Sequence, residues 1–217
     1  MTATQVDRLG DRLRKGNVSE EDLRLLDDFR RSFSPAYESV VATIRDDLGL
    51  LPTGRPAKST ASVVEKLRRE SMRLTQMQDI AGCRLIVTDL TMQDSVVGSL
   101  LGCLEESVVV DRRMKPSHGY RAVHVVAYVG GQAVEIQIRT ELQHLWAEFS
   151  EKLSDVLDPG LKYGHGDASI RTTLLKASEF VRKLEQAELK GAIPDVQSIK
   201  SDIRALFALL LEEMKGV

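Results

Sequence analysis

The chain has 217 residues, of which 42% are apolar, and this is enough to bury one substantial core. Its 30 basic and 32 acidic residues leave a formal charge of -2, so no overall positive field draws it to nucleic acid or to an anionic membrane. Any site for a polyanion must therefore be local. The polar N-terminus lacks the apolar stretch of a signal peptide, and no apolar run has the length of a bilayer span. We expect a cytoplasmic protein without a membrane partner.

The cysteines do not indicate a disulfide framework or a zinc site. Cys83 and Cys103 are the 2 cysteines of the chain, and neither belongs to a Cys-x-x-Cys or Cys/His ligand pattern. We expect both to be buried apolar residues.

The first part of the chain predicts two helices and a loop. Ser19 followed by Asp22 is typical of a capped helix start, and the helix is expected to reach about Arg31. Ser34 and Pro35 predict a second helix with a serine cap. Residues 49–56 contain glycines and prolines that break the periodicity, and they predict a connecting loop.

The rest of the chain alternates between helical and strand patterns. Helical spacing is found in residues 59–73, 91–104, 140–157, 169–190 and 195–214. Strand patterns are found in residues 83–88, 108–110, 120–129 and 132–139. The last two strands are separated by Gly130 and Gly131, which is a strong signal for a two-residue hairpin turn. The order of elements predicts a mixed sheet covered by helices.

The hairpin register separates apolar from polar side chains. If the two glycines form the turn, Val129 lies opposite Gln132 and His124 lies opposite Gln137. One face then carries the valines and isoleucines, and the other carries Tyr120, His124, Glu135, Gln137 and Arg139. Arg84 joins the polar face from the preceding strand. A polar sheet face either meets water or lines a site, and periodicity does not decide between these two.

Three motifs are more specific than their periodicity. They are Asp79-Ile-Ala-Gly-Cys-Arg84, Gly119-Tyr-Arg-Ala-Val-His124 and Glu135-Ile-Gln-Ile-Arg-Thr140, in this order. Together they resemble the RelA/SpoT synthetase family over about residues 55–165. The resemblance implies an α+β, nucleotidyltransferase-like fold with a mostly antiparallel sheet covered by helices. It divides the chain into N-terminal helices (1–54), a synthetase core (55–165) and C-terminal helices (166–217).

The resemblance also implies a reaction. The family transfers pyrophosphate from ATP to the ribose 3′-hydroxyl of GDP or GTP, which yields the (p)ppGpp alarmones of the stringent response, and it requires Mg²⁺. Charge that accumulates on the phosphates needs hard cations and basic side chains for its stabilisation. Asp79 matches the family's magnesium aspartate, although a turn cap is the structural alternative. Glu135 matches a glutamate that binds metal or acts as general base on the acceptor hydroxyl, and a solvated strand glutamate is its alternative.

The remaining matched residues divide into a donor and an acceptor set. The ATP-binding set is Arg55, Lys58, Ser62, Lys66, Arg69 and Arg84. Lys58, Ser62 and Lys66 would share a helix face if the helix has begun by Lys58, and an ordinary solvated face is the alternative. The family commonly has arginine where this chain has Pro56, and Arg55 is the substitute we expect.

The acceptor-binding set is Arg112, Lys115, Tyr120, His124, Gln137 and Arg139. Tyr120 matches a tyrosine that stacks on the acceptor base, and His124 matches a histidine that contacts acceptor phosphate or ribose. Arg139 is expected to orient Glu135 by a charge-assisted hydrogen bond. A strand-edge tyrosine and a structural histidine are the alternatives.

The acceptor itself stays open because loop 111–118 departs from the usual family sequence. Toxic members of the family have similar short forms, and some pyrophosphorylate the 3′ CCA end of tRNA and block translation. Arg112, Arg113 and Lys115 are suited to nucleotide phosphates or to an RNA backbone. For a toxin of this type the resemblance implies a neutralising antitoxin. A catalytically inactive nucleotide-binding regulator is a third alternative.

Two expectations concern the flanking helices. No histidine–aspartate cluster before residue 55 resembles the family's hydrolase centre, so synthesis without hydrolysis is expected. The apolar stripes of the C-terminal helices either pack on the core or form contacts in a homo-oligomer or with a partner.

Overall fold

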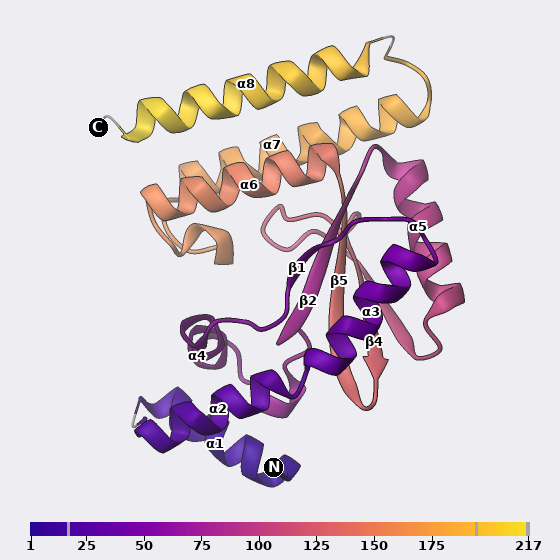
Figure 1. The fold of residues 1–217 in the computed structure, drawn as a ribbon. Helices are drawn as coiled ribbons and strands as arrows, with labels where there is room; N and C mark the ends of the chain where they lie inside the picture. The colour runs from indigo at the N-terminus through magenta and orange to yellow at the C-terminus, as the bar shows by residue number, and fades with distance from the viewer. Residues whose placement is uncertain (17, 194, 216–217) are drawn as a thin grey trace. The chain divides into compact units, whose positions relative to one another are not determined.

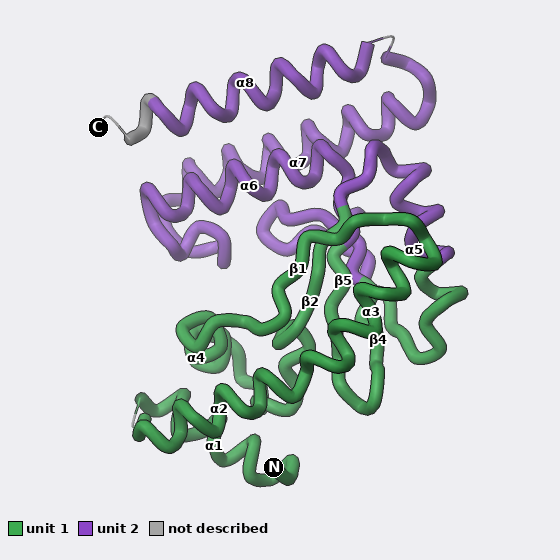
Figure 2. The backbone as a smooth tube through the Cα atoms, in the orientation of Figure 1, with its two compact units in different colours: residues 1–85, 100–109, 125–137 green, residues 86–99, 110–124, 138–217 purple. Residues whose placement is uncertain are grey.

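The computed structural model describes the backbone of residues 1–16, 18–193 and 195–215, and the side chains of these residues up to Glu212. It forms two compact units, each of which draws on several parts of the chain (Figure 2). Unit 1 contains residues 1–85, 100–109 and 125–137, and unit 2 contains residues 86–99, 110–124 and 138–217.

A five-stranded sheet has the strand order β1-β2-β5-β4-β3 (Figure 1). The strands are β1 (Thr53–Arg55), β2 (Ala81–Val87), β3 (Ser107–Asp111), β4 (Val123–Val129) and β5 (Gln132–Thr140). This mixed, mostly antiparallel sheet with helices confirms the predicted α+β fold class. Strand β1 was not predicted, because it consists of three exposed residues in a segment rich in glycine and proline. It pairs antiparallel with β2, and Arg55 lies opposite Gly82.

Unit 1 contains the N-terminal helices. They are α1 (Ala3–Lys15), α2 (Glu20–Arg31), α3 (Ser34–Asp46) and α4 (Thr60–Arg69), followed by a short 3₁₀ turn η1 (Leu74–Gln76). The predicted Ser19 capping box is present at the start of α2, with Asp22 as its third helical residue. The predicted Ser34 cap is wrong, because Ser34 is already helical and Phe33 precedes it without a side-chain cap bond.

The core of unit 1 explains why α1 forms. Val6, Leu9 and Leu13 recur along one face of α1 and are buried against α4 and η1. A Thr2–Gln5 capping box begins the helix, and Gly16 in the left-handed conformation ends it. Our sequence interpretation did not include this helix, although its caps and apolar spacing were present.

Unit 2 contains the C-terminal helices. They are α6 (Glu141–Val156), α7 (Ala168–Leu189) and α8 (Val196–Lys215), with a 3₁₀ turn η2 (Leu161–Tyr163) between α6 and α7. Both α7 and α8 pack on α6 around a core that includes Trp146, Leu174 and Leu211. Phe149 of α6 stacks on Phe207 of α8, with 4.3 Å between ring centroids. Helix α5 (Leu90–Cys103) follows β2 in the chain.

The hairpin has the predicted turn. Gly130 and Gly131 lie between β4 and β5 with φ values of 57° and 78°, as a two-residue turn of type I′ requires. In β5, Val134, Ile136 and Ile138 are buried while Glu135 and Gln137 are half-buried, which matches the predicted alternation. Strand β4 differs, because all residues from Val123 to Ala127 are buried.

Two further predictions need correction. Cys83 is buried as expected, but Cys103 is exposed at the end of α5. The strand predicted from Tyr120 begins only at Val123, because His118 and Gly119 both have positive φ values and turn the backbone. In the described part of the chain, no helix combines the length and the apolar character needed to cross a bilayer.

Candidate functional site

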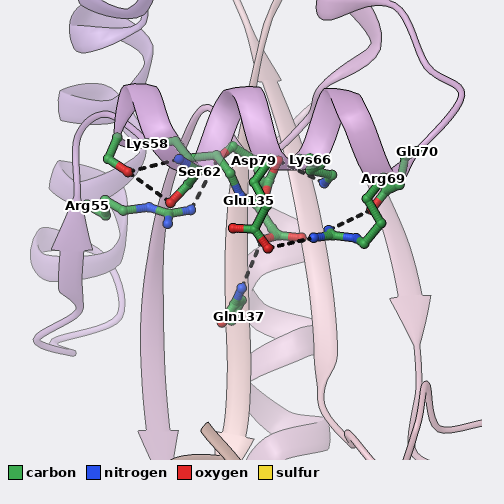
Figure 3. Close-up of polar contacts among 11 residues, drawn as sticks. Arg55, Lys58, Ser62, Lys66, Arg69, Glu70, Asp79, Glu135 and Gln137 are labelled. Atoms are coloured by element: carbon green, nitrogen blue, oxygen red, sulfur yellow. Dashed lines mark hydrogen bonds and ion pairs between the residues drawn. The ribbon is translucent and has the colours of Figure 1, made fainter. Parts of the chain in front are cut away.

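Asp79 is held between two lysines in unit 1. Its Oδ2 atom lies 2.7 Å from Lys58 Nζ, and its Oδ1 atom lies 2.9 Å from Lys66 Nζ. Only 14% of the Asp79 side chain is exposed, and 11% and 20% of the two lysine side chains. Both carboxylate oxygens are therefore engaged by cations in a largely dry environment (Figure 3).

The electrostatics favour the ionised aspartate. Burial raises the pKa of Asp79, but the charge of Lys66 and the hydrogen bond and charge of Lys58 more than offset this, so its pKa lies below the ordinary value. The carboxylate is thus charged at neutral pH and available to a divalent cation, provided that the lysines have another anion to bind.

The two lysines reach Asp79 from different local structures. Ser59 caps α4, so Lys66 lies in the last turn of the helix while Lys58 precedes it. The shared helix face expected for Lys58, Ser62 and Lys66 is therefore wrong for Lys58. A backbone hydrogen bond from Lys58 N–H to Ile80 O (2.7 Å) positions the residue instead. Ser62 forms a hydrogen bond with Ser59 through their hydroxyl groups (2.8 Å).

Further basic side chains lie around this centre. Arg55 reaches from β1 and donates to the backbone oxygen of Asp79 (3.3 Å). Arg69 forms ion pairs with Glu65 and Glu70 at the end of α4. In Figure 3, Arg55 and Lys58 flank the carboxylates on one side and Arg69 flanks them on the other. Arg84 is half-buried on β2. Unit 1 thus contains the whole predicted ATP-binding set, and Arg55, Lys58 and Lys66 of that set contact Asp79.

Glu135 lies on β5 next to the strand that follows Asp79. A Cβ atom on Gly82 would lie 2.6 Å from the Glu135 backbone oxygen, so only glycine allows this close approach of β2 to β5. Gln137 Nε2 donates to Glu135 Oε2 (2.9 Å), which helps to orient this carboxylate. Burial, together with the nearby charge of Glu135, raises the pKa of the Cys83 thiol to about 12, so this thiol stays protonated at neutral pH.

These residues fit a magnesium ion that the substrate helps to hold. Among the residues that the structure describes, no cluster of three or more acidic, histidine or cysteine side chains could enclose a metal. Mg²⁺ commonly takes one or two protein carboxylates and completes its shell with phosphates and water. Asp79 and Glu135 provide this kind of donor set, and the basic residues beside them are suited to the phosphates.

In unit 2 an aromatic ring, an imidazole and a guanidinium form a compact cluster. The Tyr120 hydroxyl lies 2.9 Å from His124 Nε2, and Arg139 Nε donates to the same hydroxyl (3.3 Å). The guanidinium carbon of Arg139 also lies 4.9 Å from the centre of the Tyr120 ring. His124 and Arg139 are buried, so these two residues belong to a polar cluster and not to a solvated face.

The described contacts of Gln137 and Arg139 lie in different units. Gln137 donates to Glu135, and both residues lie in unit 1. Arg139 donates to Tyr120 in unit 2. Gln137, which was predicted in the acceptor set, is thus placed beside the predicted catalytic carboxylate.

The turn that carries Tyr120 is anchored by helices α6 and α7. Ser178 Oγ on α7 donates to Gly119 O (2.5 Å), and a Cβ atom on Gly119 would lie 2.8 Å from the Trp146 ring on α6. Arg121 is buried; it donates to Ser178 Oγ (3.0 Å) and to the backbone oxygen of Arg113, and it pairs with Glu179. Sequence reasoning missed Arg121 and Ser178, because residues so far apart in sequence give no local pattern.

The basic residues of loop 111–118 have different environments. Arg113 is tied to Asp94 (2.6 Å) and Asp111 (2.7 Å), so an RNA or nucleotide phosphate would have to compete with two carboxylates. Arg112 is half-buried and Lys115 is exposed. Within the described residues neither side chain has a polar partner, so both are available to an anion.

Comparisons with known proteins relate this chain to RelA/SpoT proteins. A sequence profile described as the region found in RelA/SpoT proteins matches residues 54–154. An uncharacterized protein of Mycobacterium tuberculosis is 41% identical over 155 residues, which cover 68% of this chain and 56% of the relative. The match thus spans little more than half of that relative. A probable chloroplast GTP diphosphokinase of Arabidopsis thaliana is 25% identical over 72% of this chain and 22% of its own length.

Solved structures support the fold. Small alarmone synthetase 1 from Bacillus subtilis, bound to its product pppGpp, matches with a TM-score of 0.59 and 25% identity over 81% of this chain and 100% of its own. A Streptococcus mutans protein matches with a TM-score of 0.53 and 23% identity over 83% of this chain and 99% of its own, which shows a shared fold. Residues 54–154 of the chain therefore match the region found in RelA/SpoT proteins, and the fold is like that of small alarmone synthetases.

Proposed function

We propose that this protein is an ATP-dependent pyrophosphokinase that transfers the β,γ-diphosphate of ATP to the ribose 3′-hydroxyl of GDP or GTP. The observation that carries the proposal is the ionised Asp79 held between Lys58 and Lys66, with further arginines beside it. This arrangement has the charge needed by a triphosphate and its metal. The predicted acceptor residues Tyr120, His124 and Arg139 provide an aromatic ring and polar groups for a base and its sugar phosphate.

On the donor side, binding exchanges ionic partners. An incoming triphosphate offers Lys58 and Lys66 oxygen anions in place of Asp79, and the released carboxylate can then ligate a cation. Bound Mg²⁺ would neutralise negative charge on the phosphates and on the departing AMP oxygen. The lysines thus pair with Asp79 when the site is empty and bind phosphate when it is filled.

The group transfer needs one proton acceptor. The 3′-oxygen of the acceptor attacks the β-phosphorus, and the bond from this phosphorus to the oxygen that bridges it to the α-phosphorus breaks, so that AMP leaves with that oxygen. Glu135 takes the hydroxyl proton as general base, while Gln137 keeps its carboxylate oriented. The products are AMP and a nucleotide with a 3′-diphosphate.

A labelled-transfer assay tests this function. ATP with radiolabel in its γ-phosphate is incubated with Mg²⁺ and with GMP, GDP, GTP or uncharged tRNA, and the products are separated. We expect label in a guanosine nucleotide together with an equal amount of AMP. Formation of ADP would indicate single phosphoryl transfer and would refute the proposal.

A second candidate is pyrophosphorylation of the 3′ CCA end of tRNA. The observation in its favour is loop 111–118, where Arg112 and Lys115 are available to an RNA phosphate backbone. In the same assay, label that appears only in tRNA would establish this reaction in place of alarmone synthesis. In that case a neutralising antitoxin becomes the expected partner.

The substitution Glu135→Gln tests the third alternative, an inactive regulator. It keeps the size and the hydrogen-bonding ability of the side chain but removes the base. We expect the transfer rate to fall by about a hundredfold or more while ATP still binds. An unchanged rate would remove Glu135 from the reaction, and no transfer to any acceptor by the native chain would favour a binding role.

A further inference from the structure

Strand β3 is an edge strand with an apolar surface. It ends the sheet order, and Val108, Val109 and Val110 are 52%, 39% and 36% exposed. Successive residues of a strand point to opposite faces, so both faces of this strand meet solvent. Natural proteins usually protect such an edge, because its free backbone groups pair readily with another strand.

The hydrogen bonds to β4 identify the backbone groups that point outward. Arg112 N–H donates to Ala122 O (3.0 Å), and Glu106 O accepts from Tyr128 N–H (2.8 Å). Because backbone groups of alternate residues point to opposite edges, the even-numbered residues of β3 face β4. Ser107, Val109 and Asp111 therefore present their N–H and C=O groups to the open edge.

The sequence around β3 is complementary to itself when it is read antiparallel. A twofold axis at Val109 places Ser107 opposite Asp111 and Glu106 opposite Arg112 of a second copy. The outward groups of Val109 would then bond to the same residue of the other copy. Among the described residues, the side chains of Glu106 and Arg112 have no polar partner, so both charges are available for this pairing.

We propose that β3 pairs antiparallel with β3 of a second copy of this chain, on a twofold axis at Val109. The interface is isologous, since each outward backbone group and each flanking charge meets its complement across the axis. The occupant is a second copy because three observations agree on one symmetric register. The odd-numbered residues of β3 present their backbone groups outward, the valines are exposed, and the flanking charges are opposite. An unrelated strand could pair with the backbone groups but would not match the charges.

A proline substitution isolates the backbone contribution. Val109→Pro removes an N–H that faces the open edge and leaves the bonds to β4 in place, and proline is tolerated at such edge positions. The matched control Val109→Thr keeps the N–H and the β-branched shape. We expect sedimentation velocity to show that Val109→Pro halves the mass of the native assembly, while Val109→Thr keeps it. Circular dichroism and thermal unfolding verify that both variants fold.

Charge reversal tests the register. Glu106→Arg alone and Arg112→Glu alone place like charges opposite each other at both ends of the interface, and each should weaken dimerisation at least tenfold. The double variant restores opposite charges and should recover most of the native affinity. Recovery distinguishes direct pairing from an unrelated loss of stability.

Cysteine cross-linking provides a second measurement. In a Cys103→Ser background, Val109→Cys places two thiols across the axis at a separation suited to a disulfide, whereas Val108→Cys lies diagonal to its symmetry mate. Mild oxidation should therefore cross-link the first variant and not the second. The proposal is overturned if the native chain is monomeric at every concentration, if Val109→Pro keeps the native mass, or if the two cysteine variants cross-link equally.

Discussion

Replacement of Asp79 by asparagine should separate ATP binding from catalysis. Each of the two lysines lies within 2.9 Å of a carboxylate oxygen in the native protein. At a charge separation of about 4 Å and an effective dielectric constant of about 20, such a pair is worth about 4 kcal/mol. Loss of hydration offsets most of this attraction. A triphosphate must draw the lysines away from Asp79. Part of the net attraction between the lysines and Asp79 is therefore lost when ATP binds to the native protein.

In Asp79→Asn the lysines have no such partner to leave. If the net gain is about 1.4 kcal/mol, metal-free ATP should bind about tenfold more tightly than to the native protein. The transfer rate with Mg²⁺ should nevertheless fall by about a hundredfold or more, because a metal ligand is lost. Isothermal titration calorimetry in the presence of a chelator measures the first effect, and the labelled-transfer assay measures the second.

A matched control neutralises a different carboxylate of the same region. Glu65→Gln removes the half-exposed partner of Arg69 and leaves Lys58 and Lys66 paired with Asp79. It should change neither quantity by more than about twofold, as expected for an exposed ion pair. Weaker binding of metal-free ATP to Asp79→Asn than to the native chain would refute the exchange of partners.

Three further predictions concern unit 2. Gly119→Ala places a Cβ atom against Trp146 at a φ of 90°, so it should cost about 1–3 kcal/mol of stability and raise the KM for the acceptor but not for ATP. Arg139→Lys loses the planar contact with Tyr120 and should raise the acceptor KM about tenfold. Burial raises the pKa of Glu185 from 4.5 to about 7. Between these two pH values the folded state keeps a proton that the unfolded state has lost, so the free energy of unfolding should fall as pH rises from 4.5 to about 7. The total change in unfolding free energy is on the order of 3 kcal/mol, and urea unfolding at several pH values measures it. Glu185→Gln should abolish this pH dependence.

Each of these predictions has a defined failure. Gly98→Ala is the control for the first, because its Cβ atom meets no neighbour and helix α5 should gain slightly in stability. An acceptor KM that is equally changed in both glycine variants would refute the role of the turn. For Arg139→Lys, a larger effect on the KM of ATP would contradict the acceptor assignment. If Glu185→Gln keeps the native pH dependence of the unfolding free energy, a group other than Glu185 is responsible for that dependence.

Local sequence patterns predicted the parts of the fold that local physics determines. The Gly130–Gly131 turn and the alternation around Glu135 were correct because a two-residue turn and a period of two constrain the hairpin. The bounds of α2, α7 and α8 were close to prediction, since caps and apolar stripes mark them. Strand β1 and the buried polar residues His124 and Arg139 depend on tertiary pairing, which periodicity does not describe.

The site shows the same division. Motifs singled out Asp79, Glu135 and Tyr120, but they gave no indication that Lys58, which precedes α4, and Lys66, in the last turn of α4, would both pair with Asp79. Arg121 lies inside a recognised motif and was still missed, because its partners Ser178 and Glu179 are on a helix distant in sequence. The spacing of residues within a motif indicates local backbone geometry. The contacts that hold a turn in place come from residues distant in sequence, which the spacing does not indicate.

The anchoring of the Gly119–Tyr120 turn by α7 has a consequence for how such proteins diversify. Ser178 and Glu179 lie outside residues 54–154, the region shared with RelA/SpoT proteins. Substitutions on this helix can therefore shift the tyrosine without altering any residue of the shared motifs. If Tyr120 binds the acceptor as proposed, acceptor preference can change through this helix while the motif sequence stays constant, and motifs alone would then not report the preference.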